Sequence, residues 1–325
     1  MKILLTHPPQ ARAQYYGERS LNGLQALARV VLHESNDALD ANGLIEAARD
    51  VDLIVADRLT EGRGEIFARL PKLRAFVRCA VDIRNIDVDA ASAVGVLVTR
   101  AGPGFVASVT ELALGYLVDL SRGISRATAD YHSGRNPEIA MGRQLAGSRL
   151  GIIGYGNIGR HLAAVAQSLG MTVLAADPLA TIDDSSIEHV SLDDLLGRAD
   201  YVVCLAVAND DTENLIGHAA FSRMQPHAFF INLSRGNLVD ETALASALRD
   251  NRIAGAAIDV GRARDQMPTP ELAKLPNVIA TPHIGGLTPP AIESQSLETV
   301  RQIEAIINGT IPVGAVNAGH WTRRS

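Results

Sequence analysis

Three glycines in the segment GYGNIG (154–159) have the spacing of a loop that binds the phosphates of a dinucleotide. An apolar run precedes the segment, and an amphipathic helical pattern follows it. In such a unit the first glycine permits a tight turn, the second lets backbone approach a pyrophosphate, and the third lets helix pack on strand. The N–H groups that begin the helix would face the phosphates. The pattern predicts a dinucleotide site, and the alternative is a glycine-tolerant turn without a ligand.

Asp177 ends the next apolar run, about twenty residues beyond the glycines. A carboxylate at this place would accept hydrogen bonds from the adenosine ribose and would repel a 2′-phosphate. No arginine follows it directly in the stretch DPLAT (177–181). We therefore expect NAD rather than NADP, and the alternative for Asp177 is a solvated loop acid.

Short apolar runs alternate with helical patterns along the whole chain, which indicates parallel sheets covered by helices on both faces. The expected strands cover residues 2–6, 51–57, 73–79, 95–99, 149–156, 171–177, 199–207, 228–234, 254–260 and 277–282. The expected helices cover residues 18–31, 42–50, 62–70, 87–94, 106–132, 157–170, 191–199, 240–252 and 291–309. Ser191 and Asp240 are expected to be N-caps, each followed by acidic residues in the first turn.

The last expected helix has no strand left to pair with in the middle of the chain, so we expect it to return to the first sheet. The prediction is an α/β fold of two Rossmann-like, doubly wound parallel-sheet domains with a cleft between them. Residues 1–99 plus 288–325 would form a discontinuous substrate domain, and residues 100–287 would form an NAD-binding domain. Two chain crossings would then act as a hinge.

Length and composition agree with two ordinary domains. The chain has 325 residues, of which 47% are hydrophobic and 20% charged, so a packed core is expected and disorder is not. The net charge of -6 and the lack of a Lys/Arg-rich run argue against a nucleic-acid or acidic-membrane surface.

Cys79 and Cys204 each lie in an apolar run that resembles a buried strand. We expect buried free thiols rather than a disulfide or a metal pair. The apolar run at the N-terminus ends at His7 and two prolines, too early for a signal peptide or a membrane span. A cytoplasmic location is the default expectation.

Three blocks appear in a characteristic order: LAGSRLGIIGYGNIGRHLA (145–163), FFINLSRGNLVDETALASAL (229–248) and LPNVIATPHIGGLT (275–288). With them the chain resembles the D-isomer-specific 2-hydroxyacid dehydrogenases over almost its whole length. The resemblance implies an NAD-dependent oxidoreductase that acts on a small carboxylate substrate. It also implies a homodimer with the active site in the cleft.

The resemblance assigns roles by position. Arg235 would bind the substrate carboxylate and polarise its carbonyl, since a planar guanidinium offers paired donors. His283 would be the general acid in reduction and the base in oxidation, because its pKa lies near working pH. Asp259 would help to hold the nicotinamide end. The alternatives are an Arg235 paired with a surface acid and a satisfied loop histidine at 283.

The complete set of predicted site residues follows from the motif and the resemblance together. The cofactor is expected to contact Gly154, Tyr155, Gly156, Asn157, Ile158, Gly159, Asp177, Leu233, Ser234 and Asp259. The substrate is expected to contact Val81, Asp82 and Arg235, and no metal is expected.

Position 264 departs from the family. Five places after Asp259, the family has a glutamate that bonds the catalytic histidine and raises its pKa, and here the residue is Arg264. An inward Arg264 would lower that pKa, since a like charge disfavours imidazolium. Asp265 would take over if the loop shifts, or Arg264 would point to solvent. Without a carboxylate partner, His283 would titrate near or below about 6.5, and reduction would favour acidic pH.

The segments expected near the substrate also differ from the family pattern, and we call them the rewritten segments. RCAVDIRNID (78–87) replaces a glycine-rich loop, Phe105 replaces a common asparagine, and AVANDD (206–211) replaces another family stretch. The arginines near these segments are Arg78, Arg84, Arg100, Arg262 and Arg264. They suggest a substrate with a second anionic group, or they are merely solvated. The alternative function is an NAD-binding sensor or interaction protein with weak or lost dehydrogenase activity, but the retention of Arg235 and His283 favours an enzyme.

Overall fold

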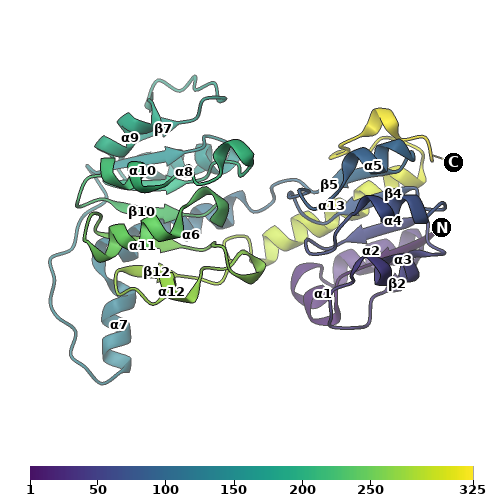
Figure 1. The fold of residues 1–325 in the computed structure, drawn as a ribbon, viewed down its shortest axis with the longest axis horizontal. Helices are drawn as coiled ribbons and strands as arrows, with labels where there is room; N and C mark the ends of the chain where they lie inside the picture. The colour runs from purple at the N-terminus through teal and green to yellow at the C-terminus, as the bar shows by residue number, and fades with distance from the viewer. Residues whose placement is uncertain (325) are drawn as a thin grey trace. The chain divides into compact units, whose positions relative to one another are not determined.

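The computed structural model describes residues 1–324, apart from the side chain of Asp265. It separates into two compact units. The first unit combines Met1–Phe105 with Leu287–Ser325, and the second is Val106–Gly286. The boundaries expected from the sequence were 99/100 and 287/288. In Figure 1 the yellow C-terminal segment lies in the same unit as the purple N-terminal segment.

The first unit contains a five-stranded parallel sheet in the order β2-β1-β3-β4-β5. Its strands are β1 (Lys2–Leu5), β2 (Arg29–Leu32), β3 (Leu53–Ala56), β4 (Ala75–Arg78) and β5 (Leu97–Arg100). Neighbouring residues of β1 enter different cores: Ile3 and Leu5 enter one, and Leu4 enters the other. Both faces of the sheet are therefore buried, as the continuous apolar runs predict.

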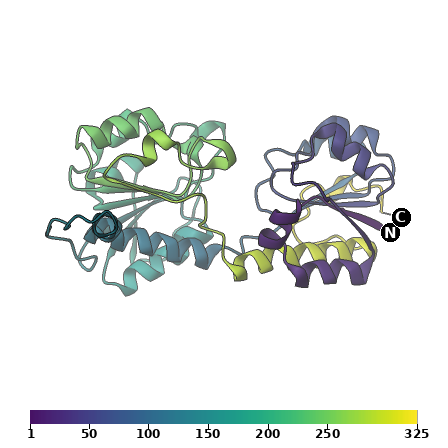
Figure 2. The ribbon, with the colours of Figure 1, turned by 90° about the horizontal axis from the view of Figure 1, so that it is seen from below.

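Helices cover both faces of this sheet. One face carries α2 (Glu18–Leu27) and α13 (Pro289–Ile307), which contact each other, and α1 (Pro9–Tyr15) contacts α13. Figure 2 shows the purple and yellow helices together below the sheet. The other face carries α3 (Ala41–Ala48), α4 (Gly64–Arg69) and α5 (Val88–Ala93).

Helix α13 is attached to the first unit by polar side chains as well as apolar ones. Ser296 Oγ lies 2.7 Å from Ser20 Oγ, and Thr299 Oγ1 lies 2.8 Å from Tyr16 OH. Gln302, 1% exposed, accepts from Thr99 Oγ1 at 2.8 Å. Its amide group also donates to the carbonyls of Arg100 and Val313. These bonds specify the position of the helix, because a shift would leave buried polar groups unpaired.

The second unit contains a seven-stranded parallel sheet in the order β12-β11-β10-β9-β6-β7-β8. Its strands are β6 (Arg149–Ile153), β7 (Thr172–Ala176), β8 (Ile187–His189), β9 (Tyr201–Cys204), β10 (Phe229–Asn232), β11 (Gly255–Ile258) and β12 (Val278–Ala280). The strand order reverses between β6 and β9. Loops at the carboxyl ends of those two strands diverge and leave room for a ligand.

The helices of the second unit also form two layers (Figure 2). Helices α6 (Val106–Arg122) and α8 (Asn157–Ser168) contact each other and pack on strands of the sheet. The other layer consists of α9 (Leu192–Arg198), α10 (His218–Arg223) and α11 (Glu241–Arg249), packed around one apolar core. The short α12 (Pro270–Ala273) precedes β12, and α7 (Ile124–His132) projects from these layers (Figure 1).

Several expected elements are correct in type and two are wrong. Ser191 and Asp240 are N-caps whose side chains accept backbone N–H bonds. Residues 29–31, expected at the end of a helix, belong to the edge strand β2, because pairing with β1 overrides the helical pattern. The helix expected over 106–132 breaks at Gly123, whose φ of +64° ends α6 before α7 begins. Strand β8 and helices α1, α10 and α12 were not expected.

The thiol prediction is confirmed: Cys79 and Cys204 are both free and buried, and burial raises the pKa of each to about 12. Within residues 1–324, no helix is both long and apolar enough to cross a bilayer.

Candidate functional site

The glycine loop follows β6 at the point where the strand order of the second unit reverses. Gly154 has a φ of +94°, and a Cβ on it would lie 2.5 Å from the backbone nitrogen of Ala206. A Cβ on Gly159 would lie 2.5 Å from the carbonyl oxygen of Gly154. A Cβ on Gly156 would meet no other described atom within 4 Å. The first and third glycines therefore permit close packing, whereas the second faces open space.

The start of α8 supplies donors beside that open space. Gly156 is the N-cap residue, and Arg160 N is the first nitrogen to donate back into the helix, to Gly156 O at 2.9 Å. The N–H groups of Asn157, Ile158 and Gly159 thus have no carbonyl one turn earlier to bond. Asn157 is exposed and Ile158 half-buried. This arrangement suits a pyrophosphate, which needs several N–H donors and the positive end of a helix.

Asp177 follows β7 and faces the glycine loop. Its Oδ2 accepts from Tyr155 N at 2.8 Å, and its Oδ1 accepts from Leu179 N at 2.9 Å and Ala180 N at 3.2 Å. The half-buried carboxylate thus connects two loops and retains accepting capacity for a ribose hydroxyl. The residues present fit the adenosine end of NAD.

Arg235 lies in the loop after β10, and the side chain of buried Asn232 bonds that loop. Asn232 Oδ1 accepts from Ser234 N at 3.1 Å, and Asn232 Nδ2 donates to Arg235 O at 3.0 Å. Ser234 Oγ donates to Ala206 O at 2.5 Å, and Ala206 also packs against Gly154. Leu233 and Ser234 therefore lie beside the glycine loop, as the cofactor prediction requires. Asn232 was not singled out in the sequence, where it is only the polar end of an apolar run.

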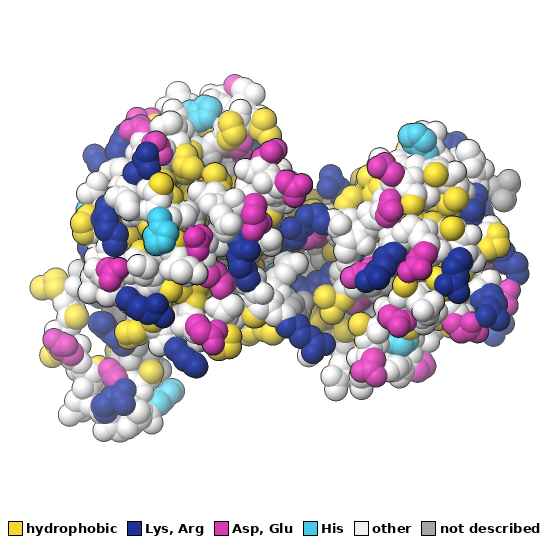
Figure 3. Space-filling view, viewed as in Figure 1, with side chains coloured by type: hydrophobic (Ala, Val, Ile, Leu, Met, Phe, Trp, Pro, Cys, Tyr) yellow, Lys and Arg dark blue, Asp and Glu magenta, His cyan; other side chains and the backbone are white. Residues whose placement is uncertain are grey.

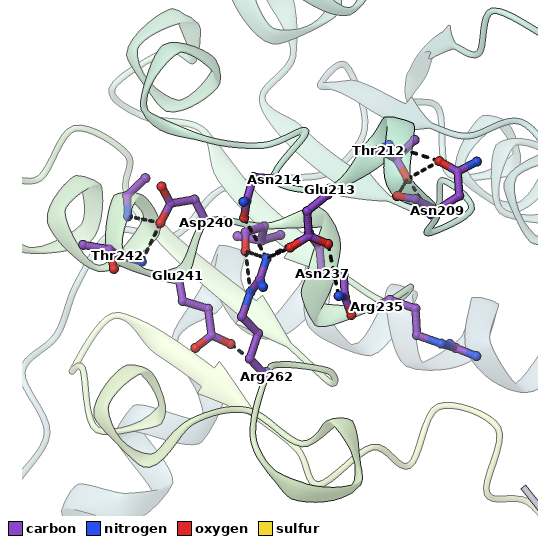
Figure 4. Close-up of polar contacts among 12 residues, drawn as sticks. Asn209, Thr212, Glu213, Asn214, Arg235, Asn237, Asp240, Glu241, Thr242 and Arg262 are labelled. Atoms are coloured by element: carbon purple, nitrogen blue, oxygen red, sulfur yellow. Dashed lines mark hydrogen bonds and ion pairs between the residues drawn. The ribbon is translucent and has the colours of Figure 1, made fainter. Parts of the chain in front are cut away.

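Arg262 holds the Arg235 loop from the other side (Figure 4). Its guanidinium donates to the carbonyls of Asn237 and Val239 and pairs with Glu213 Oε1 at 2.9 Å. Figure 4 shows that the Arg235 side chain points away from this network. A Cβ on Gly236 would lie 2.2 Å from the carbonyl of Gly261, so the two loops touch through backbone. Arg262 is thus a structural cross-link between these loops, and a role for it in binding a substrate anion stays a prediction.

His283 follows β12, and Asp259 follows β11, the strand between β12 and β10. Asp259 is 2% exposed, and its carboxylate accepts from the N–H groups of Ile284 and Gly285, both at 2.8 Å. His283 N donates to Asp259 O at 3.0 Å. Arg235, Asp259 and His283 therefore follow three adjacent strands at one edge of one sheet.

Position 264 lies in a short 3₁₀ turn, Arg264–Gln266. The side chain of Arg264 is exposed, in agreement with the alternative that it points to solvent. The side chain of Asp265 lies outside the described residues, so its proposed role as a substitute stays a prediction.

The expected substrate residues Val81 and Asp82 lie in the first unit and are half-buried. Asp82 pairs with Arg84, with 2.7 Å between Oδ2 and Nη2. Arg78 is fully buried and bonds the carbonyls of Asp57 and Thr60 and the side chain of Asn85. Burial lowers the pKa of Arg78 to about 10, although Asp57 and Asp82 act in the opposite direction. Arg78 therefore links Asn85 of the rewritten loop to residues 57–60.

The two remaining arginines, Arg100 and Arg264, are exposed. Among the side chains that the structure describes, no three His, Cys, Asp or Glu residues are grouped closely enough to hold a metal ion.

Comparison with known proteins places this geometry in one family. Residues 114–285 match the model described as "D-isomer specific 2-hydroxyacid dehydrogenase, NAD binding domain". The chain is 36% identical to the (S)-sulfolactate dehydrogenase of Chromohalobacter salexigens over 81% of this chain and 87% of that protein. It is 33% identical to the D-3-phosphoglycerate dehydrogenase of Mycobacterium leprae over 86% of this chain, but spans only 54% of that protein.

Solved structures share the fold. The TT0316 protein of Thermus thermophilus superimposes with a TM-score of 0.88 and 26% identity, covering 97% of this chain and all of that one. A D-2-hydroxyisocaproate dehydrogenase superimposes with a TM-score of 0.87, covering 98% of this chain and 100% of that one. Its 24% identity supports the fold alone.

We predict that Asp177→Asn weakens discrimination against NADPH by about tenfold or more, because the charge that repels a 2′-phosphate is removed. Asparagine keeps an acceptor for the N–H groups of Leu179 and Ala180. Fluorescence titration with NADH and NADPH measures the ratio of dissociation constants. Asp183→Asn, on the exposed loop nearby, is the matched control. An unchanged ratio would show that Asp177 does not face the ribose.

Proposed function

Because the chain belongs to the D-isomer specific 2-hydroxyacid dehydrogenase family, we propose that Arg235 and His283 serve hydride transfer between NAD(H) and a 2-hydroxy or 2-oxo acid. One observation carries the proposal. The glycine loop and the loops of Arg235 and His283 all follow strands of one parallel sheet and lie at its carboxyl edge. Ligands of such sheets bind at that edge.

The nicotinamide, when bound, supplies the hydride for reduction and takes it up in oxidation. Arg235 binds the substrate carboxylate with paired donors and places the carbonyl carbon in line for transfer. His283 gives its proton to the carbonyl oxygen in reduction and removes it from the hydroxyl in oxidation. The unit Val106–Gly286 serves as the NAD-binding domain and the first unit as the substrate domain.

The substrate class is a 2-hydroxy or 2-oxo acid that carries a second anionic group. The two relatives described above, at 36% and 33% identity, are named for acids of this class. The second anionic group is a sulfonate in one and a phosphate ester in the other. Arg78 and Arg262 hold loops and Arg84 pairs with Asp82, which leaves Arg100 and Arg264 as the exposed guanidiniums of this group. A second charge-assisted contact is worth about 1.5–3 kcal/mol, or roughly 10–150-fold.

The test is NADH consumption with four acids: 2-oxopropanoate, its 3-sulfo and 3-phosphooxy derivatives, and oxaloacetate. We expect kcat/KM for at least one dianionic acid to exceed that for 2-oxopropanoate by about tenfold or more. His283→Asn should lower kcat by about 10²–10⁴-fold with little change in KM. Arg235→Lys should raise KM strongly while the NADH dissociation constant stays unchanged. NADH binding without turnover of any acid would instead support a sensor.

Position 264, where the family has the glutamate that bonds the catalytic histidine, is occupied by Arg264. Arg264 is exposed, and Asp265 is the carboxylate next to it in the sequence. We propose that Asp265 replaces the family glutamate. A neighbouring carboxylate raises the pKa of an imidazole, and reduction needs the imidazolium, which is present below that pKa and is lost above it.

Asp265→Asn should therefore move the alkaline limit of the reduction profile to lower pH, by about one unit. The profile of kcat/KM between pH 5 and about 9 measures it, with Arg264→Ala as the exposed neighbouring control. If Asp265→Asn leaves the limit in place, another group holds the imidazole.

We also propose a homodimer in a reducing, cytoplasmic compartment. In the segment LALGYLV (112–118), Ala113, Tyr116 and Leu117 are buried within their own unit, so this face of α6 is core. The better dimer surface is the arm of residues 124–142, where Ile139 is 99% and Met141 100% exposed. No residue of α7 is buried, and hydrophobic side chains stand out at the left edge of Figure 3. Such exposure suits an interface.

Ile139→Asp combined with Met141→Asp should convert a dimer into a monomer, because both charges would be buried at the interface. Light scattering after size-exclusion chromatography measures the mass. Val313→Asp, at a residue of the first unit that is 81% exposed, is the control. A wild-type chain that is already monomeric, or a double variant that stays dimeric, would contradict this surface.

A further inference from the structure

A chain of hydroxyl groups runs from helix α6 to the loop of His283. The phenol of Tyr116, on α6, bonds the hydroxyl of Thr281, and Thr281 Oγ1 donates to Asp259 Oδ1. Tyr116 is 3% exposed and Asp259 2% exposed, so the ends of this chain are shielded from water. All three residues belong to the second unit.

The direction of the bonds follows from the number of protons. Thr281 has one hydroxyl proton, and the Asp259 carboxylate receives it. Tyr116 must then donate to Thr281. Burial raises the pKa of Tyr116, and the negative charge of Asp259 adds to this while the bond to Thr281 opposes it. The phenol therefore keeps its proton at neutral pH, and the bonds polarise one another in series.

Asp259 is the centre around which residues 281–285 are wrapped. Its two oxygens accept from Thr281 Oγ1 and from the N–H groups of Ile284 and Gly285, and its carbonyl accepts from His283 N. His283 has a φ of +56°, a conformation that residues other than glycine rarely adopt. Hydrogen bonds on both sides of His283 thus hold it in a backbone conformation that is unfavourable for a residue other than glycine.

Helix α6 packs against the loop of residues 281–285. A Cβ on Gly285 would lie 2.9 Å from Asp259 Oδ2, and 3.5 and 3.6 Å from Val109 and Leu112 of α6. The loop is therefore packed between the carboxylate and the helix. Loss of the Tyr116–Thr281 bond would remove the restraint that α6 places on the Thr281 hydroxyl and, through it, on the Asp259 carboxylate.

We propose that Tyr116 and Thr281 are positioning residues of the reaction, which act by fixing Asp259 and through it the backbone and ring of His283. The inference depends on the proposed function, because it gives His283 the proton-transfer role. It goes beyond that function in assigning a part of the site to α6, which precedes the glycine loop in the chain. A merely structural role would make the same bonds a source of stability, with no effect on the imidazole.

Thr281→Val removes the hydroxyl at nearly constant shape, Thr281→Ser retains it, and Tyr116→Phe removes only the outer bond. We expect Thr281→Val to lower kcat by about 10–100-fold, and Tyr116→Phe by about 3–10-fold, since small misplacements of a catalytic group have effects of this size. KM and the NADH dissociation constant should stay within about twofold. Thr281→Ser should restore kcat. A melting curve for each variant identifies any that fails to fold. If Thr281→Val does not fold, the kcat of Tyr116→Phe alone tests the positioning role.

A second readout needs no substrate. In protein labelled with ¹⁵N-histidine, His283→Gln identifies the ring signals of His283 among the nine histidines. We expect these signals to shift in Thr281→Val and Tyr116→Phe and to coincide with wild type in Thr281→Ser. Unmoved signals, or unchanged kcat in a folded Thr281→Val, would overturn the positioning role. An inactive wild type with shifted signals would overturn the proposed function and leave the positioning of the His283 loop supported.

Discussion

The buried carboxylate of Asp259 is the interaction on which the candidate site most depends. A charge that is 2% exposed is stable only when donors surround it, and here they come from a single short loop. The carboxylate therefore dictates the path of residues 281–285, including the left-handed conformation of His283. The resemblance assigns Asp259 to the nicotinamide, but most of its accepting capacity is used within the protein. Its contribution to catalysis would come chiefly from the order it imposes.

Two arginines also hold loops through several hydrogen bonds each. Arg262 bonds two carbonyls in the loop after Arg235, and Arg78 bonds two carbonyls and an amide in the first unit. Each guanidinium has five N–H donors in a fixed fork, so one side chain can hold two loops in register. An arginine near a binding loop is therefore weak evidence for an anionic ligand until its donors are accounted for. In this chain Arg78 and Arg262, two of the five arginines near the rewritten segments, use their donors to hold loops.

Close contacts between backbone segments also hold the loops at the expected cofactor site. Gly154 lies against Ala206, Gly159 against the carbonyl of Gly154, and Gly236 against Gly261. Side chains at these places would push apart loops that must converge at one edge of the sheet. Gly156 differs, because the space beyond it is open. One motif thus combines two physical roles, dense packing and access for a ligand.

The sequence by itself determined what depends on local pattern: the alternation of strands and helices, the N-caps Ser191 and Asp240, the buried thiols, and the glycine loop with Asp177 beyond it. These follow from periodicity, spacing and residue type, which are visible along the chain. Tertiary structure decided the rest. Pairing with β1 made residues 29–32 a strand, and the turn at 264–266 left Arg264 exposed. The bonds from Tyr116 to Thr281 and from Thr281 to Asp259 join residues far apart in sequence, and no local pattern encodes such contacts.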